Sequence, residues 1–197
     1  SDLVIIKYNA GNIFSVEHAF KRLGIEAVVT GDKELIRKAD KVIFPGVGEA
    51  SSTMQHLQQT GLDKLIPDLK QPVLGICLGM QLMCSRSEEG NVDCLNIFGT
   101  EVKRFVPQKH EDKVPHMGWN TIVNKEHPLF EGLHNPYLYF VHSFHAVTSE
   151  KNIIGTTTYG YEFTSAVNKD NIYGFQPHPE KSHDNGLRIL KNFVNIK

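Results

Sequence analysis

Apolar residues in the first half of the chain form short continuous runs separated by segments with helical spacing. The runs predict strands at residues 3–8, 27–29, 41–44 and 73–76. Between them, apolar side chains recur every three or four residues, which predicts helices at 13–23, 33–38 and 78–84. Short and nearly all-apolar strands are typical of a parallel sheet covered on both faces. The first half therefore predicts an α/β fold.

The second half has a different pattern. Segments of β type at 102–106, 137–144, 153–158 and 163–167 follow one another without strong helices between them, which predicts a mixed or antiparallel extension of the same sheet. An amphipathic helix at 182–196 closes the pattern, and the charged stretch 108–113 predicts an exposed loop. At about 150 residues per domain, we expect one layered α/β domain, 1–197, with a central mixed, mostly parallel sheet.

Charge and composition narrow the classes of partner. Lys and Arg total 21 and Asp and Glu total 22, so no basic excess exists to bind nucleic acid or an anionic membrane. No apolar run approaches the roughly 20 residues of a membrane helix. The three cysteines are an odd number without Cys-x-x-Cys spacing, which favours reduced thiols over disulfides or zinc. We therefore expect a cytoplasmic protein.

The sharpest chemical signal is Gly75-Ile76-Cys77-Leu78-Gly79, where an apolar strand gives way to a helix. This is the pattern of a nucleophile elbow with Cys in the place of Ser, in which flanking glycines allow close backbone approach. The helix N-terminus points its positive end at the sulfur and favours a thiolate. The alternative is a buried cysteine in a glycine-rich turn.

A thiol nucleophile needs a base and a group that orients the base. His178-Pro179-Glu180 supplies both, since residues i and i+2 of an extended segment point to the same side. Taken alone, such a pair is common on protein surfaces. Pro45-Gly46-Val47-Gly48 follows another predicted strand, and its N–H groups could face an oxyanion. The glycine patterns of nucleotide-binding loops are absent.

In combination, the motifs at 45–48, 75–81 and 178–180 resemble those of the triad-type, or class I, glutamine amidotransferases. Three further segments, 10–12, 114–120 and 139–144, are similar to the branch of that family whose glutaminase subunits serve histidine biosynthesis. The resemblance spans most of the chain. It implies a flavodoxin-like three-layer fold and a glutaminase that passes ammonia to a separate cyclase subunit of (β/α)8-barrel fold, its obligate partner.

The resemblance also assigns roles to individual residues. Cys77 would be the nucleophile, His178 the base and Glu180 the group that fixes the imidazole. The oxyanion hole would be formed at Leu78, Val47 and Gly48. The glutamine pocket would be lined by Gln81, His142, Ser143 and Phe144. The residues expected at the cyclase interface are Asn12, Trp119 and Lys181. No cofactor is implied, and a metal at His142 and His145 lacks a third ligand.

Two local departures from the family pattern stand out. Gln176-Pro177 precedes His178 where an aromatic residue is common, so a backbone donor is lost and the local sheet pairing is in question. Lys7-Tyr8-Asn9 stands where many relatives carry an acidic residue and a glycine, so contacts there could be rearranged.

Three other readings remain open from the sequence. One is an amidotransferase glutaminase that serves anthranilate, guanylate or pyridoxal phosphate synthesis, which would share the triad but not Pro115-His116-Met117-Gly118-Trp119-Asn120. A second is a catalytically silent binding or regulatory subunit of the same fold. A third is a thiol hydrolase or stress protein with an elbow cysteine.

Overall fold

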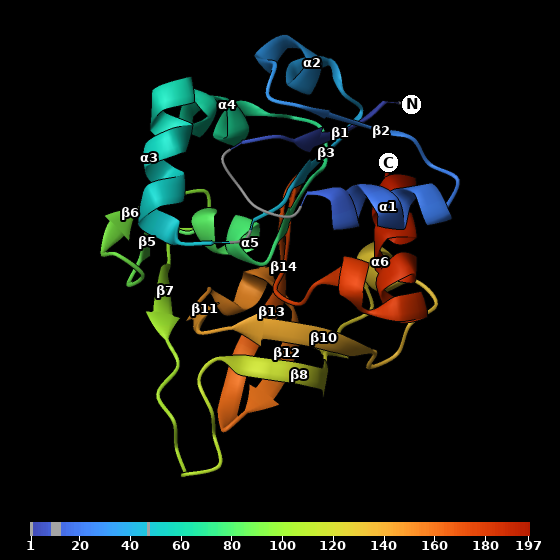
Figure 1. Ribbon diagram of the computed structural model, residues 1–197. Coiled ribbons are helices and arrows are strands. Elements are labelled where there is room, and N and C mark those ends of the chain that lie inside the picture. The colour runs from blue at the N-terminus through green and yellow to red at the C-terminus, as the bar shows by residue number, and fades with distance from the viewer. Residues whose placement is uncertain (1, 9–12, 47) are drawn as a thin grey trace.

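The computed structural model describes residues 2–8, 13–46 and 48–197, and they form three layers around a central sheet (Figure 1). In spatial order, the strands of this sheet are β2 (Ala27–Thr30), β1 (Leu3–Ile6), β3 (Lys41–Phe44), β4 (Val73–Ile76), β14 (Ile172–Phe175), β13 (Tyr161–Lys169), β12 (Ile153–Tyr159) and β9 (Val123–Asn124). The first five run parallel and the last three are antiparallel to their neighbours. The predicted mixed, mostly parallel sheet is confirmed.

Helices cover both faces of this sheet, which is why its central strands are apolar throughout. One face carries α1 (Phe14–Arg22) and α6 (His183–Asn195). The other carries α2 (Lys33–Lys38), α3 (Ala50–Thr60), α4 (Leu62–Asp68) and α5 (Leu78–Leu82). Side chains alternate between two separate cores, so that Ile5 and Ile43 pack toward α1 and α6 while Val4 and Phe44 pack toward α3 and α5.

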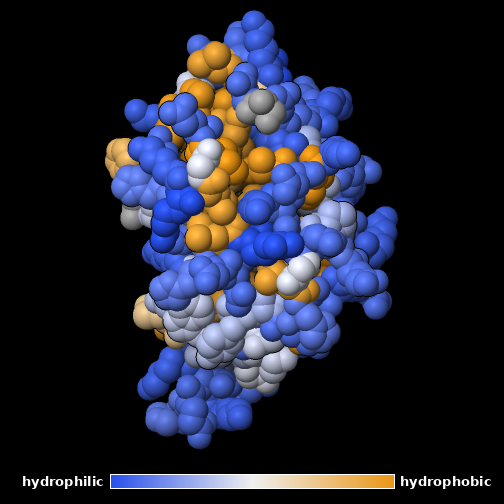
Figure 2. Space-filling view, turned by 90° about the vertical axis from the view of Figure 1, so that its right-hand side faces the viewer, coloured by the Kyte–Doolittle hydropathy of each residue, from blue (hydrophilic) through white to orange (hydrophobic). Residues whose placement is uncertain are grey.

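Two small sheets complete the part of the chain that the structure describes. One has the order β11 (Phe144–Ala146), β7 (Glu101–Arg104), β5 (Arg86–Ser87) and β6 (Val92–Asp93), and the other pairs β10 (Tyr137–His142) with β8 (His116–Thr121). Short 3-10 turns lie at η1 (Pro128–Phe130), η2 (Glu150–Asn152) and η3 (Pro179–Lys181). The stretch 108–113 forms turns and a loop at the lower end of Figure 1, where the surface in Figure 2 is hydrophilic.

The expectation of one extended sheet is confirmed for 153–167 and wrong for 102–106 and 137–144. The apolar run at 137–144 is divided at Ser143 between β10 and β11, which belong to different small sheets. The Ser143 carbonyl accepts a hydrogen bond from Phe105 N at 3.0 Å just beyond β7. The polar pair His142-Ser143 marks this point in the sequence, but Phe144 follows at once, so the segment was interpreted as one strand.

Pro177 does not disturb the central sheet. The strand β14 ends at Phe175, and the backbone N–H of Gln176 still donates to Ser165 O at 2.9 Å on the neighbouring strand. The missing N–H of Pro177 thus falls beyond the paired segment. Among the described residues, no helix is both long and apolar enough to cross a membrane.

Candidate active site

Cys77 lies in the turn between β4 and α5, at the carboxyl edge of the parallel strands. Its φ of 55° is in the left-handed region that non-glycine residues rarely adopt. The turn is tight because α5 approaches β3 closely: a Cβ on Gly79 would lie 2.1 Å from the Phe44 carbonyl oxygen. A Cβ on Gly75 would lie within 2.9 Å of the Gly79 backbone. Both glycines therefore allow the strand and helix geometry that presents the sulfur.

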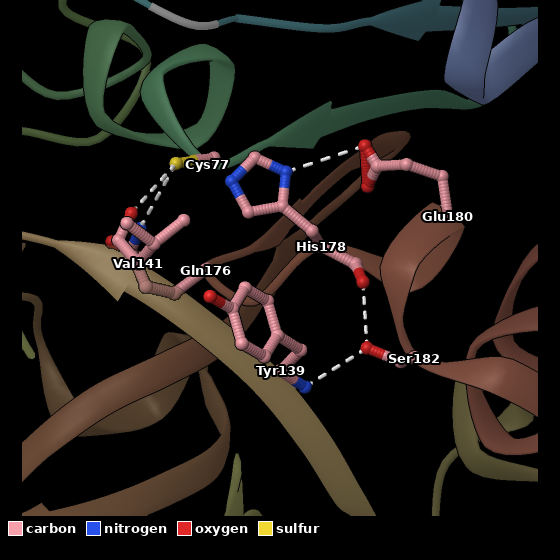
Figure 3. Close-up of polar contacts among 7 residues, drawn as sticks. All are labelled: Cys77, Tyr139, Val141, Gln176, His178, Glu180 and Ser182. Atoms are coloured by element: carbon pink, nitrogen blue, oxygen red, sulfur yellow. Dashed lines mark hydrogen bonds and ion pairs between the residues drawn. The ribbon is translucent and has the colours of Figure 1, made fainter. Parts of the chain in front are cut away.

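His178 and Glu180 reach this turn from the segment that follows β14 (Figure 3). The Nδ1 atom of His178 lies 3.2 Å from Glu180 Oε2, and both side chains are almost fully buried. Two backbone contacts fix the histidine: His178 N donates to Tyr139 O at 2.9 Å, and Ser182 Oγ donates to His178 O at 2.6 Å. The neighbouring strand β10 thereby holds the segment that carries the histidine.

The charges around His178 favour its protonated form. Burial disfavours the imidazolium and lowers the pKa of His178. The Cys77 sulfur acts in the opposite direction through its charge and a hydrogen bond, and so does the Glu180 carboxylate. Together they outweigh burial and raise the pKa of His178 to about 10. His178 therefore carries a proton at neutral pH and can give it to a leaving group. Cys77, His178 and Glu180 lie together in the arrangement of nucleophile, acid–base and orienting group.

Among the described residues, two further polar groups lie near the sulfur (Figure 3). The Gln176 Nε2 atom lies 3.6 Å from Cys77 Sγ, and the Val141 carbonyl oxygen lies 3.9 Å from it. Gln176 is completely buried, and its Oε1 accepts a hydrogen bond from Gln81 Nε2 at 2.9 Å. Sequence reasoning noted Gln176 only as an unusual neighbour of the histidine motif. It missed the contact with the sulfur.

A cavity of about 340 Å³ opens over the sulfur. Several residues expected at the site line it, namely Gly48, Cys77, Leu78, Gln81, His142, Ser143, Phe144 and His178. Lys181, which was expected at the partner interface, lines it as well. Glu89 also lines it, and sequence reasoning missed this residue although it stands in an acidic pair before Gly90. Val47 and Asn12 lie outside the described residues.

Trp119 does not take part in this cavity. It lies on β8, is 37% exposed, and stacks on Tyr137 and His183 with ring centroids 5.8 Å and 5.3 Å apart. A larger groove of about 1010 Å³ lies between α6 and residues 124–134, and it contains none of the residues predicted for the site. The candidate active site is therefore the smaller cavity, because it contains Cys77 and His178.

Two buried histidines support the wall of the cavity. His142 Nδ1 must donate to the Phe144 carbonyl oxygen, 2.8 Å away, because a carbonyl only accepts. Its Nε2 then accepts from His116 Nδ1 at 3.0 Å, and Asn120 Nδ2 lies 3.3 Å from His116 Nε2. Burial lowers the pKa of His142 to about 3 and that of His116 to about 4. Both rings are therefore neutral and act as structural hydrogen-bonding groups.

No group of three or more His, Cys, Asp or Glu side chains among the described residues could hold a metal ion. His142 and His145 are instead parts of an aromatic cluster around Phe105, with ring centroids 5.0 Å and 4.7 Å from it.

The family model for "Glutamine amidotransferase class-I" matches residues 4–196. The chain belongs to the class I glutamine amidotransferases. The expected resemblance is thus confirmed, and this amidotransferase presents Cys77 and His178 in one cavity, with Glu180 3.2 Å from the histidine ring.

Relatives of this amidotransferase carry a more specific name. The chain is 60% identical over 195 residues to "Imidazole glycerol phosphate synthase subunit HisH" of Bacteroides thetaiotaomicron, covering 98% of this chain and 99% of the relative. Proteins of the same name from Sulfurimonas denitrificans and, as "HisH 1", Methanococcus maripaludis are 51% and 48% identical, with coverage of 98% or more of both chains.

Solved structures are similar to this amidotransferase in fold. A structure titled glutamine amidotransferase aligns with a TM-score of 0.77 at 17% identity over 99% of this chain and 98% of the other. A glutamine amidotransferase from Thermotoga maritima aligns with a TM-score of 0.65 at 15% identity over 98% and 80%. At such identities the likeness concerns the fold alone.

Proposed function

We propose that this chain is the glutaminase subunit of imidazole glycerol phosphate synthase. It hydrolyses glutamine to glutamate and ammonia and passes the ammonia to a cyclase subunit of barrel fold, in histidine biosynthesis. The observation that carries the proposal is the 60% identity, over nearly the whole of both chains, to a protein named as that subunit. Cys77 and His178 line one cavity, and Glu180 lies 3.2 Å from His178 Nδ1; together they supply the nucleophile, the acid–base group and the orienting group of a glutaminase.

The first half of the reaction forms a thioester. The Cys77 thiolate attacks the side-chain amide carbon of glutamine, and the carbonyl becomes a tetrahedral oxyanion. The His178 imidazolium then gives its proton to the amide nitrogen, the C–N bond breaks, and ammonia leaves. Glu180 accepts the Nδ1–H hydrogen bond at 3.2 Å and so keeps Nε2 directed at the reacting atoms.

The second half releases glutamate. The neutral His178 takes a proton from water while the water oxygen attacks the thioester carbon. The C–S bond breaks, its electron pair returns to sulfur, and the imidazolium and thiolate are restored. One glutamine and one water have then become one glutamate and one ammonia.

The oxyanion would form beside the start of α5. Leu78 is the first residue of that helix, so its N–H has no carbonyl partner within the helix and points toward the N-terminal end. Gly48, with φ of 108°, lines the same cavity and can direct an N–H in a way open mainly to glycine. A donor in such a position is worth about 3–4 kcal/mol of transition-state stabilisation.

The α-amino group of glutamine would be recognised by Glu89, another residue that lines the cavity. Glu89 is half-buried there, and its Oε1 accepts from Ala50 N at 2.9 Å, which fixes the carboxylate. A carboxylate fixed in a cavity is a suitable partner for the α-ammonium group of the substrate. Gln81 and the 142–144 segment form the remaining wall around the side chain.

The cyclase would dock on the outer face of β8 and β10. Met117 is 62% exposed, Tyr137 54% and Trp119 37%, and Trp119 stacks on Tyr137. Exposed aromatic and methionine side chains are typical of protein interfaces. Lys181 lies between this face and the cavity, since it lines the cavity and directly precedes the Ser182-His183 step whose imidazole stacks on Trp119.

The proposal is tested by glutamate release from glutamine by the purified chain, with and without the barrel-fold cyclase of the same organism and the ribotide substrate of that cyclase. We expect strong stimulation by the loaded cyclase and none in Cys77→Ala. Absence of turnover when complex formation has been confirmed would leave a binding subunit without catalysis. Equal turnover with and without the cyclase would indicate a free-standing thiol hydrolase.

A further inference from the structure

The side-chain amide of Gln176 contacts the sulfur of Cys77. Its side chain is completely buried, and both ends of its amide have partners: Nε2 lies 3.6 Å from Cys77 Sγ, and Oε1 lies 2.9 Å from Gln81 Nε2. The residue follows β14, and its backbone is held by the bond to Ser165 O. Gln176 is 99 positions from Cys77 in the sequence, so the contact exists only in the fold.

The hydrogen-bond network fixes which end of this amide meets the sulfur. The Phe144 carbonyl oxygen cannot donate, so the atom of Gln81 that lies 2.9 Å from it must be the NH₂ group. That same NH₂ group faces the Gln176 amide, whose nearer end must therefore be the oxygen. The nitrogen of Gln176 is left to face Cys77. The Phe144 carbonyl thus fixes the orientation of the Gln81 amide, and the Gln81 amide fixes that of Gln176.

We propose that Gln176 is a catalytic residue of this glutaminase, whose amide N–H hydrogen-bonds the Cys77 sulfur when it is a thiolate, while Gln81 positions that amide. This inference rests on the proposed function. The Val141 carbonyl, 3.9 Å from Sγ, is an acceptor for a protonated thiol. The sulfur thus has an acceptor for its S–H form and a donor for its anionic form. A hydrogen bond donated to a charged group is stronger than one between neutral groups, so the amide stabilises the thiolate over the thiol.

The same contact serves both halves of the reaction. In the first half, the N–H holds the sulfur in place as it attacks the amide carbon in its anionic form. When water hydrolyses the thioester, the C–S bond breaks and the electron pair returns to sulfur, so the departing thiolate again receives the N–H. Because the amide is already oriented by Gln81 and Phe144, no reorganisation is needed at either step.

The proposal is tested in the complex with the cyclase by Gln176→Met, which keeps the side-chain length and removes the donor. We expect kcat for glutamine hydrolysis to fall roughly ten- to a hundredfold, as the loss of one hydrogen bond to a charged group predicts. The KM for glutamine should stay nearly constant, because Gln176 does not line the cavity. The matched control is Gln71→Met: the Gln71 amide also donates to a backbone carbonyl, Ile36 O at 2.8 Å, but lies outside the site.

A second measurement needs neither glutamine nor the cyclase. The rate at which iodoacetamide alkylates Cys77 in the free chain, followed by peptide mass spectrometry, reports the reactivity of the sulfur itself. We expect alkylation to be slowed roughly tenfold in Gln176→Met and unchanged in Gln71→Met. This readout separates the inference from the proposed function, since it holds whether or not the chain serves the cyclase.

Gln176→Leu also removes the donor, with an apolar side chain of similar volume, and it replaces Gln176→Met if the methionine variant does not fold. A folded variant of either kind with the kcat and alkylation rate of the unaltered chain would overturn the inference. So would a loss confined to KM with unchanged alkylation, since that result would make Gln176 a support of the pocket only.

Discussion

The Tyr8 hydroxyl donates a hydrogen bond to the carbonyl oxygen of Pro45. The end of β1 is thereby tied to the turn after β3, whose next residue, Gly46, would bring a Cβ within 2.9 Å of the same hydroxyl. Burial, and then the nearby Cys77 sulfur, raise the pKa of Tyr8, so the phenol stays protonated and remains a donor. Tyr8, which belongs to the unusual Lys7-Tyr8-Asn9 segment, therefore fixes the position of the turn proposed to bind the oxyanion.

Removing the hydrogen bond between Tyr8 and Pro45 should lower both the free energy of unfolding and kcat. Tyr8→Phe leaves the buried Pro45 carbonyl without its donor, which costs about 1–3 kcal/mol of unfolding free energy. We expect kcat for glutamine hydrolysis to fall as well, because the turn that contains Gly48 loses a fixed point. Chemical denaturation and steady-state kinetics measure the two effects.

Tyr159→Phe is the matched control for Tyr8→Phe. It also removes a hydroxyl that donates to a backbone carbonyl, Lys113 O, but this bond does not involve the turn at 45–48. A fall in kcat of equal size in both variants would show that the Pro45 bond has no particular connection to the active site.

The elbow turn leaves no room for a side chain at Gly79. In Gly79→Ala the new Cβ would lie 2.1 Å from the Phe44 carbonyl oxygen, so β3 and α5 would have to separate. We expect a loss of at least about 3 kcal/mol of unfolding free energy, or failure to fold. Gly99→Ala is the control, since nothing lies within 4 Å of its Cβ position. Equal denaturation midpoints for the two variants would contradict the close approach of α5 to β3.

The role proposed for Glu89 concerns binding of glutamine before the chemistry. Glu89→Gln removes the charge that faces the α-ammonium group, so the KM for glutamine should rise roughly tenfold while kcat changes little. Glu88→Gln alters the adjacent carboxylate, which accepts from Arg104 N at 2.8 Å and does not line the cavity, and should leave KM unaltered. If both substitutions raised KM alike, a general effect of negative charge would explain the result better.

The buried histidines predict a loss of stability in mild acid. The folded-state pKa of His142, about 3, lies below the unfolded value of about 6.5, so the unfolded chain binds a proton that the folded chain excludes. Stability is therefore full above pH 6.5 and declines as the pH falls toward 3. At pH 5 the loss from His142 alone is about 2 kcal/mol. His116, with its pKa lowered to about 4, acts in the same direction.

Denaturation at pH 7 and pH 5 measures this effect. In His142→Gln the decline between the two pH values should shrink by about 2 kcal/mol, whereas His110→Gln, on the exposed loop, should match the unaltered chain. An unchanged decline in His142→Gln would show that this ring titrates normally in the folded protein.

Local patterns were sufficient to predict the parts of the site that lie at strand ends. The run 73–76 followed by Gly75-x-Cys77-x-Gly79 specifies a strand, a tight turn and a helix, and the structure contains all three. The helices α3 and α4, between Gly48 and Val73, were not predicted, because α3 has several polar residues and α4 contains Pro67. The single-domain organisation and the cytoplasmic location stay predictions.

Contacts between distant segments could not be predicted from the pattern. Gln176 meets Cys77 only because β14 pairs with β4 in register, Phe175 beside Ile76. Glu89 reaches the cavity because its carboxylate bonds to Ala50 N, 39 positions away. Each depends on side-chain direction in the folded chain, which hydrophobic periodicity does not encode.

The most direct test of the central claim is to trap the thioester on Cys77. The complex with the loaded cyclase is mixed with glutamine, quenched in acid during turnover, and digested for peptide mass spectrometry. We predict that the peptide containing Cys77 gains the mass of glutamine less ammonia, and that Cys77→Ala gives neither the adduct nor glutamate. Glutamate release by Cys77→Ala at the rate of the unaltered chain would contradict the account.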